Sequence, residues 1–136
     1  MRILIISLLA GVAALPAFAD KTDRWNCRNV DLEISCTTDT CKVSEGHTPI
    51  DIHLTPSDIS LCAYTGCWTG PPSEVISSGR LQIFTGAALP FSNRLDTFAD
   101  VSVTIDTETG AATVMVADQF ATPAICTRTG LKVTIE

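Results

Sequence analysis

The sequence lacks an apolar run long enough to cross a membrane. Its longest apolar run covers residues 3–15 and is interrupted only by Ser7 and Gly11. That run falls short of the roughly 20 residues that a transmembrane helix needs. No second long apolar run follows it. We therefore expect the rest of the chain to have no membrane partner.

The sequence also lacks the motifs that mark common catalytic and cofactor sites. It contains no Gly-x-Ser-x-Gly, no His-Glu-x-x-His, no phosphate-binding glycine loop and no Cys-x-x-Cys. The only histidines are His47 and His53. Asp51 and His53 share one face of a predicted strand, but the spacing selects no third metal ligand beside them. We therefore expect no catalytic residue, no metal ligand and no cofactor.

Basic residues are few. Nine Lys and Arg face 15 Asp and Glu, so the formal net charge is −6. This balance argues against nucleic acids and anionic membranes as partners, because an acidic surface repels both. A basic protein is the partner that the charge suits, although acidity also serves solubility alone.

The first 19 residues have the three parts of a secretory signal peptide. Arg2 supplies a positive charge, residues 3–15 form the apolar segment, and Ala17-Phe18-Ala19 places small residues before a cleavage site. The alanine-rich segment resembles the signal peptides of Gram-negative periplasmic proteins. Cleavage would leave residues 20–136 as a single domain of charge −7, because Arg2 is lost. We expect a periplasmic or secreted protein.

Apolar and polar residues alternate with period two along most of the remaining chain, which is typical of half-buried β-strands. No segment has the pattern of a long helix. The predicted strands are residues 30–36, 41–43, 50–55, 80–84, 99–105, 112–116 and 131–135, with 74–76 as a short addition and 125–128 as a strand end. Turn residues separate them at short intervals. The sequence thus predicts an all-β fold, a small antiparallel meander of seven to eight strands that closes into a barrel or sandwich.

Three segments are predicted to be irregular. Residues 57–64 are expected to form a short turn or 3₁₀ segment, and residues 62–72 a constrained loop that carries aromatic side chains. Residues 86–93 and 118–124 are expected to be connections, the second because it contains Pro123.

The cysteines are even in number and all follow the predicted signal peptide, which indicates three disulfides in an exported protein. They are Cys27, Cys36, Cys41, Cys62, Cys67 and Cys126. Cys36 and Cys41 stand at the two ends of a four-residue turn. Cys62 and Cys67 have the same spacing. A tight turn brings such pairs within bonding distance, which leaves Cys27 to pair with Cys126.

The most distinctive segment runs from Cys62 to Gly70 and carries Tyr64 and Trp68. A disulfide would hold these two aromatic side chains in place, as binding hot spots require. We therefore name Tyr64 and Trp68 as candidate binding residues. The alternative is that Trp68 only fills one end of the barrel.

Three functions remain compatible with the sequence. The first is an exported noncatalytic binding or interaction domain, with inhibition of a basic cell-wall hydrolase such as lysozyme as a subclass suggested by fold analogy alone. The second is a small secreted hydrolase that uses carboxylates or the Asp51–His53 pair. The third is an accessory subunit of a periplasmic complex.

Overall fold

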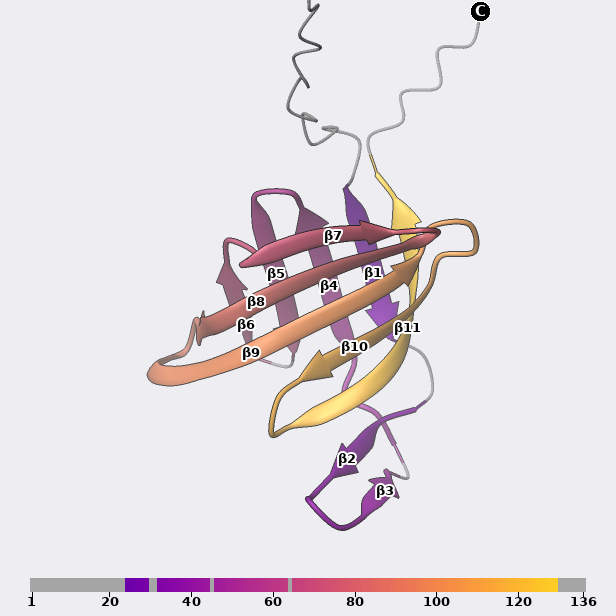
Figure 1. Cartoon of the computed structure of the whole chain (residues 1–136). Coiled ribbons are helices and arrows are strands. Elements are labelled where there is room, and N and C mark those ends of the chain that lie inside the picture. The colour runs from indigo at the N-terminus through magenta and orange to yellow at the C-terminus, as the bar shows by residue number, and fades with distance from the viewer. Residues whose placement is uncertain (1–23, 30–31, 45, 64, 130–136) are drawn as a thin grey trace, which may run out of the picture.

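The structure is a computed structural model, which describes residues 24–29, 32–44, 46–63 and 65–129, without the side chain of Leu95. The predicted signal peptide and the strand predicted at 131–135 lie outside these residues. The described part of the chain forms strands and turns, with no helix (Figure 1). It therefore contains no helical segment that could cross a membrane.

Eleven strands make up the described fold. They are β1 (Trp25–Asn29), β2 (Ile34–Cys36), β3 (Cys41–Val43), β4 (Ile50–Thr55), β5 (Asp58–Ala63), β6 (Gly66–Gly70), β7 (Glu74–Ser78), β8 (Leu81–Phe91), β9 (Arg94–Asp106), β10 (Ala111–Val116) and β11 (Phe120–Arg128). Every pair of neighbouring strands is antiparallel.

Eight strands close into a barrel in the order β1-β4-β5-β6-β8-β9-β10-β11, and β11 returns to β1. The predicted antiparallel barrel is therefore confirmed. Strand β7 is added to the edge of β8, and the β2–β3 hairpin stands off the lower end of the barrel (Figure 1). Closure leaves the barrel itself with few free strand edges.

Strands β6 and β8 share fewer paired residues than any other neighbouring strands of the barrel. It has a single register pair, Trp68 with Phe91, and beyond it Ser92 N donates to the Cys67 carbonyl at 2.9 Å. The other end of β8 pairs with β7 instead of β6. The barrel wall is thus held here by one aromatic pair and the turn that follows it.

Alternate side chains of both halves of the barrel point into one apolar core. Its fully buried members are Ile52, Leu54, Ile59, Leu61, Phe84, Val103, Ile105, Val114 and Val116. They come from β4, β5, β8, β9 and β10 and recur at every second position. Burial of these apolar side chains is the main stabilising contribution, at about 25 cal/mol per Å² of apolar surface.

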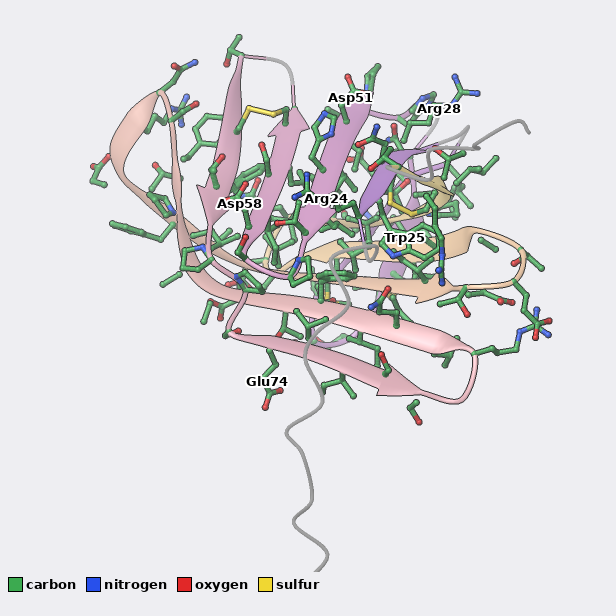
Figure 2. The ribbon with its side chains drawn as sticks, turned by 90° about the horizontal axis from the view of Figure 1, so that it is seen from above. Arg24, Trp25, Arg28, Asp51, Asp58 and Glu74 are labelled. Atoms are coloured by element: carbon green, nitrogen blue, oxygen red, sulfur yellow. A yellow bond between two sulfur atoms is a disulfide. The ribbon has the colours of Figure 1, made fainter. Side chains whose placement is uncertain are left out.

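Trp25 closes one end of this core. Its indole Nε1 donates a buried hydrogen bond to Gln82 Oε1 at 2.7 Å. The Arg128 guanidinium lies 4.8 Å from the ring centroid, a cation–π contact. Trp25 is labelled in Figure 2, in the view down onto the fold. Nε1, the one polar atom of this indole, therefore has a hydrogen-bond partner within the protein.

The three disulfides join the pairs predicted from the cysteine spacing: Cys27–Cys126, Cys36–Cys41 and Cys62–Cys67. Each links residues that face each other across two antiparallel strands. Such bridges form and persist in oxidising compartments, so the structure is consistent with an extracellular or periplasmic protein.

Two segments predicted to be irregular are strands. Residues 58–63 form β5, with Ile59, Leu61 and Ala63 buried at alternate positions, and residues 66–70 form β6. Gly66 is needed in β6 because a Cβ there would lie 2.6 Å from the Phe91 ring. The prediction was wrong for β6 because glycines that permit close packing were taken for turn residues, and for β5 because Pro56-Ser57-Asp58 was taken as the start of a turn that extends to residue 64.

The connections predicted at 86–93 and 118–124 are also mostly strand. Strand β8 continues to Phe91 through an irregularity between Gly86 and Leu89, where Ala88 has a φ of 50°. The Ala88 N–H donates to the Asp100 carboxylate at 2.8 Å, which supports the bulge. Pro123 lies within β11, opposite Thr113 of β10.

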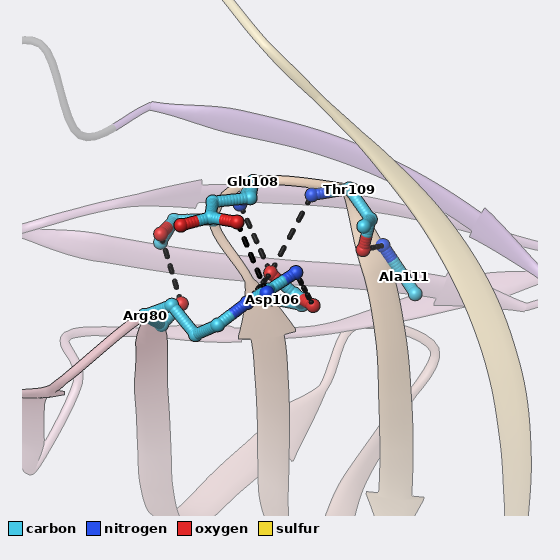
Figure 3. Close-up of polar contacts among 6 residues, drawn as sticks. Arg80, Asp106, Glu108, Thr109 and Ala111 are labelled. Atoms are coloured by element: carbon cyan, nitrogen blue, oxygen red, sulfur yellow. Dashed lines mark hydrogen bonds and ion pairs between the residues drawn. The ribbon is translucent and has the colours of Figure 1, made fainter.

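The β9–β10 turn is tied to the β7–β8 turn by an ion pair. Arg80 donates to both carboxylate oxygens of Asp106, at 2.9 and 2.6 Å, and also contacts Glu108 at 3.0 Å (Figure 3). Asp106 also accepts the backbone N–H groups of Glu108 and Thr109. Hydrogen bonding to Arg80 is the main cause that holds the pKa of Asp106 well below its usual value.

This pKa shift predicts a pH dependence of stability. A carboxyl whose pKa is lower in the folded than in the unfolded protein stabilises the fold above the unfolded value, and the contribution fades as pH falls. We expect Asp106→Asn to lower the urea midpoint at pH 7. The difference from wild type should shrink steadily below about pH 4.

The same urea titrations with Asp58→Asn, a change at an exposed aspartate of β5, provide the control. That variant should keep the wild-type midpoint at pH 7. A difference between wild type and Asp106→Asn that stays constant from pH 7 to pH 3 would contradict the ion-pair explanation.

Candidate functional site

A cavity of about 610 Å³ opens at one end of the barrel. The β8–β9 turn contributes Asn93 and Arg94, and the β10–β11 turn contributes Ala117, Asp118 and Gln119. Both turns lie at the lower left in Figure 1. Thr48, just before β4, and Ala63, at the end of β5, line the same space. The cavity is thus built where β4 and β11 begin.

The cavity and Trp25 lie at opposite ends of the barrel strands. Trp25 pairs with Leu54 near the end of β4 and with Arg128 at the end of β11. That end is closed by the Trp25–Gln82 hydrogen bond. At the opposite end, no such hydrogen bond between a tryptophan and a glutamine closes the barrel among the described residues. The cavity opens at that end.

Four aromatic side chains are among the residues that line the cavity. They are Trp68, Phe91, Phe98 and Phe120. The rings of Trp68 and Phe91 lie 4.7 Å apart, tilted by 50°. Phe91 and Phe120 pack against the core, whereas Phe98 is 56 % exposed at the rim. The wall therefore carries aromatic side chains from β6, β8, β9 and β11.

Trp68 is the unusual member of this wall. It is only 5 % exposed, and its indole Nε1 is buried without a hydrogen-bond partner in the described part of the protein. An unsatisfied buried donor costs about 1 to 3 kcal/mol. Trp25 avoids this cost through Gln82. The two tryptophans thus differ: the Trp25 indole N–H has a partner, whereas the Trp68 indole N–H has none among the described residues and has almost no accessible surface.

The rim of the cavity carries charges of both signs. Arg94 and Asp118 are exposed, and Glu33 accepts the Thr48 backbone N–H at 3.0 Å. Asn93 donates its side-chain amide to the Thr65 carbonyl. Two carboxylates against one guanidinium leave the rim with an excess of negative charge.

The structure separates the two candidate binding residues of the sequence analysis. Tyr64 lies outside the described residues. Trp68 has a buried ring, as expected if it fills one end of the barrel, but it also lines the cavity. The sequence pointed to Phe91 only as an anchor of the 86–93 segment and did not point to Phe98 or Phe120, because single phenylalanines in separate strands form no recognisable motif.

The histidine and aspartate considered for catalysis lie on the outer surface of β4. Asp51 and His53 are both exposed, and His53 Nδ1 is 2.5 Å from Asn26 Oδ1 of the neighbouring strand. Asp51 stands opposite Arg28 of β1, and both are labelled in Figure 2. No three His, Cys, Asp or Glu residues in the described ranges are grouped so that they could hold a metal ion.

The cavity therefore combines aromatic side chains and a mixed polar rim on a barrel held by disulfides. Its volume lies within the range of roughly 300 to 1,000 Å³ that is usual for small-molecule sites. This arrangement can hold and orient a small group that is partly aromatic and partly polar. No known protein family, curated protein or solved structure matches the chain.

Proposed function

We propose that this protein is an exported, noncatalytic binding domain that takes its ligand at the open end of the barrel. The observation that carries the proposal is the cavity of about 610 Å³ at one end of the barrel, with Trp68, Phe91, Phe98 and Phe120 among its lining residues. The other end is closed by the Trp25–Gln82 hydrogen bond.

The frame around the cavity supports a binding role. The Cys62–Cys67 disulfide joins β5 to β6, the strand that carries Trp68. A second bridge, Cys27–Cys126, joins the strands where the barrel closes. A site on strands that are tied in this way loses little conformational freedom on binding, which favours affinity.

The proposal places the protein in the periplasm or outside the cell after removal of residues 1–19. Its three disulfides support that location. We expect the protein recovered from a periplasmic or secreted fraction to begin at Asp20, as measured by intact mass and N-terminal sequencing. Recovery of a chain that retains Met1 would contradict export through this segment.

A change that blocks the cavity tests the binding function. Thr97 lines the cavity, so Thr97→Trp should fill part of it. Thr113→Trp makes the same change at an exposed position of β10 and is the matched control. We expect wild type and Thr113→Trp to retain the same compound or protein from periplasmic extract in native mass spectrometry. Retention by Thr97→Trp should fall at least about tenfold, because its ligand is sterically excluded.

The acidity of the chain makes a basic protein the macromolecular partner to test alongside small molecules. Lysozyme provides a basic hydrolase whose activity can be assayed with each of the three proteins. Equal retention of all ligands by the two tryptophan variants, or retention of none by wild type, would overturn the proposed function.

A further inference from the structure

We infer that two copies of this chain pair edge to edge through strand β7 and form a dimer with two-fold symmetry. The inference goes beyond the proposed function, since no residue of β7 lines the cavity. Three properties of β7 carry it: its free edge, the absence of protecting residues and its charge pattern.

Strand β7 has a neighbour on one side only. All five of its residues pair with β8, and no other described strand pairs with it. In Figure 1 it lies above β8 and β9, at the margin of this layer. Successive residues of an antiparallel strand direct their N–H and C=O groups to opposite edges. Part of the β7 backbone therefore faces away from β8 and is open to another strand.

Both faces of β7 are open as well. All five residues are exposed, among them Val75 at 37 % and Ile76 at 41 %. Successive side chains of a strand point to opposite faces, so each face leaves one of these apolar side chains in water. A strand held at one edge with both faces in water is only weakly stabilised. A second strand at the free edge would cover part of both side chains.

Strand β7 lacks the features that protect free strand edges. Proteins protect such edges with lysine, with proline or by keeping the strand very short. Strand β3, which pairs only with β2 among the described strands, has three residues and carries Lys42. Strand β7 has the sequence Glu-Val-Ile-Ser-Ser, without lysine or proline. Of these two edges, β7 is therefore the one open to association.

The charge pattern favours a second copy as the occupant. The chain has a net charge of −6, so two copies repel each other wherever carboxylates meet. Glu74, labelled in Figure 2, is the only charged residue of β7. An antiparallel pairing centred on Ile76 places each Glu74 opposite Ser78 of the other copy. The two Glu74 positions are then about 13 Å apart along the strands, so no like charges stand opposite each other.

This pairing also closes the assembly at two copies. It uses all five residues of both β7 strands, so the dimer has no free β7 edge left for a third copy. Residues that stand opposite each other point to the same face of a sheet. Ile76 therefore meets Ile76 of the other copy on one face, and Val75 meets Ser77 on the other.

Ile76→Lys tests the pairing, because it places two lysines opposite each other at the centre of the dimer. Thr113→Lys is the matched control. It adds the same charge at an exposed position of β10, in the row of paired residues that crosses the outer face from Ile76. Sedimentation velocity at increasing protein concentration measures association. We expect wild type and Thr113→Lys to be mostly dimeric at about 100 µM, and Ile76→Lys to associate at least about tenfold more weakly.

A charge swap tests the register. Ile76→Glu should also weaken the dimer, since it places two carboxylates opposite each other. An equimolar mixture of Ile76→Lys and Ile76→Glu should restore dimerisation, because a lysine then faces a glutamate. Restoration also shows that both variants are folded.

Four outcomes would overturn the inference. The first is a wild-type protein that stays monomeric at about 100 µM, and the second is a dimer that Ile76→Lys leaves intact. Equal weakening by Ile76→Lys and Thr113→Lys would place the contact on the face of the sheet instead of the edge. A mixture of the two Ile76 variants that stays monomeric would exclude the register centred on Ile76. The retention experiment with extract decides the proposed function independently.

Discussion

Replacing Cys27 and Cys126 together by alanine is expected to lower the free energy of unfolding by about 5 kcal/mol. This bridge spans 99 residues, so its removal frees nearly the whole described chain in the unfolded state. In the chain-entropy account, closing a loop of about 100 residues contributes about 4.7 kcal/mol. Both cysteines are also buried in the core, so their sulfur contacts are lost as well.

The matched control is the double replacement of Cys36 and Cys41 by alanine. This bridge spans five residues in a hairpin that stands off the barrel, and both cysteines are exposed. A loop of that size contributes about 2 kcal/mol in the same account. Urea unfolding of both variants under oxidising conditions measures the difference. Equal losses of unfolding free energy in the two variants would contradict the expectation that the longer loop, which closes the barrel at β1 and β11, contributes more stability.

Gly110→Ala is expected to cost about 3 kcal/mol or more in the free energy of unfolding. Gly110 closes the β9–β10 turn with a φ of +77°, a conformation that side chains other than glycine rarely adopt. An added Cβ would overlap the backbone carbonyl oxygen of Cys126. Cys126 N also donates a hydrogen bond to the Gly110 carbonyl at 2.8 Å, which holds the two backbones together. They therefore have little room to move apart.

Gly79→Ala separates the cost of backbone conformation from that of the overlap. Gly79, in the β7–β8 turn, has a φ of +57° but nothing within 4 Å of an added Cβ. That change should cost only about 1 kcal/mol. Thermal unfolding of the two variants gives both values under identical conditions. A Gly110→Ala variant as stable as Gly79→Ala would show that β11 yields to the added methyl group.

Much of the fold follows from local patterns. The alternation at residues 50–55, 99–105 and 112–116 predicted three strands that the structure contains, the first with the same bounds and the other two longer. The turn between Cys36 and Cys41 placed two cysteines opposite each other, which is a local property of a tight hairpin. The remaining pair then followed by elimination.

The missed strands depended on contacts between distant segments. Strand β6 contains Gly66 and Gly70, and in isolation these residues favour a turn. In the fold they leave space for Phe91 and Leu89 of β8. Pro123 was likewise assigned to a connection, yet it lies in β11 opposite Thr113. In both strands, tertiary packing outweighed the local preference of glycine and proline for turns, and the sequence pattern does not show that packing.

The sequence by itself determined the residue alternation, the acidic balance and the pairing of the cysteines, because these depend on neighbours along the chain and on simple counts. Only the tertiary structure decided that the indole N–H of Trp25 has a hydrogen-bond partner whereas that of Trp68 has none among the described residues. Trp25 meets Gln82 across 57 residues, and Trp68 meets Phe91 where β6 touches β8. Barrel closure creates both environments, since it brings together side chains that no local spacing relates.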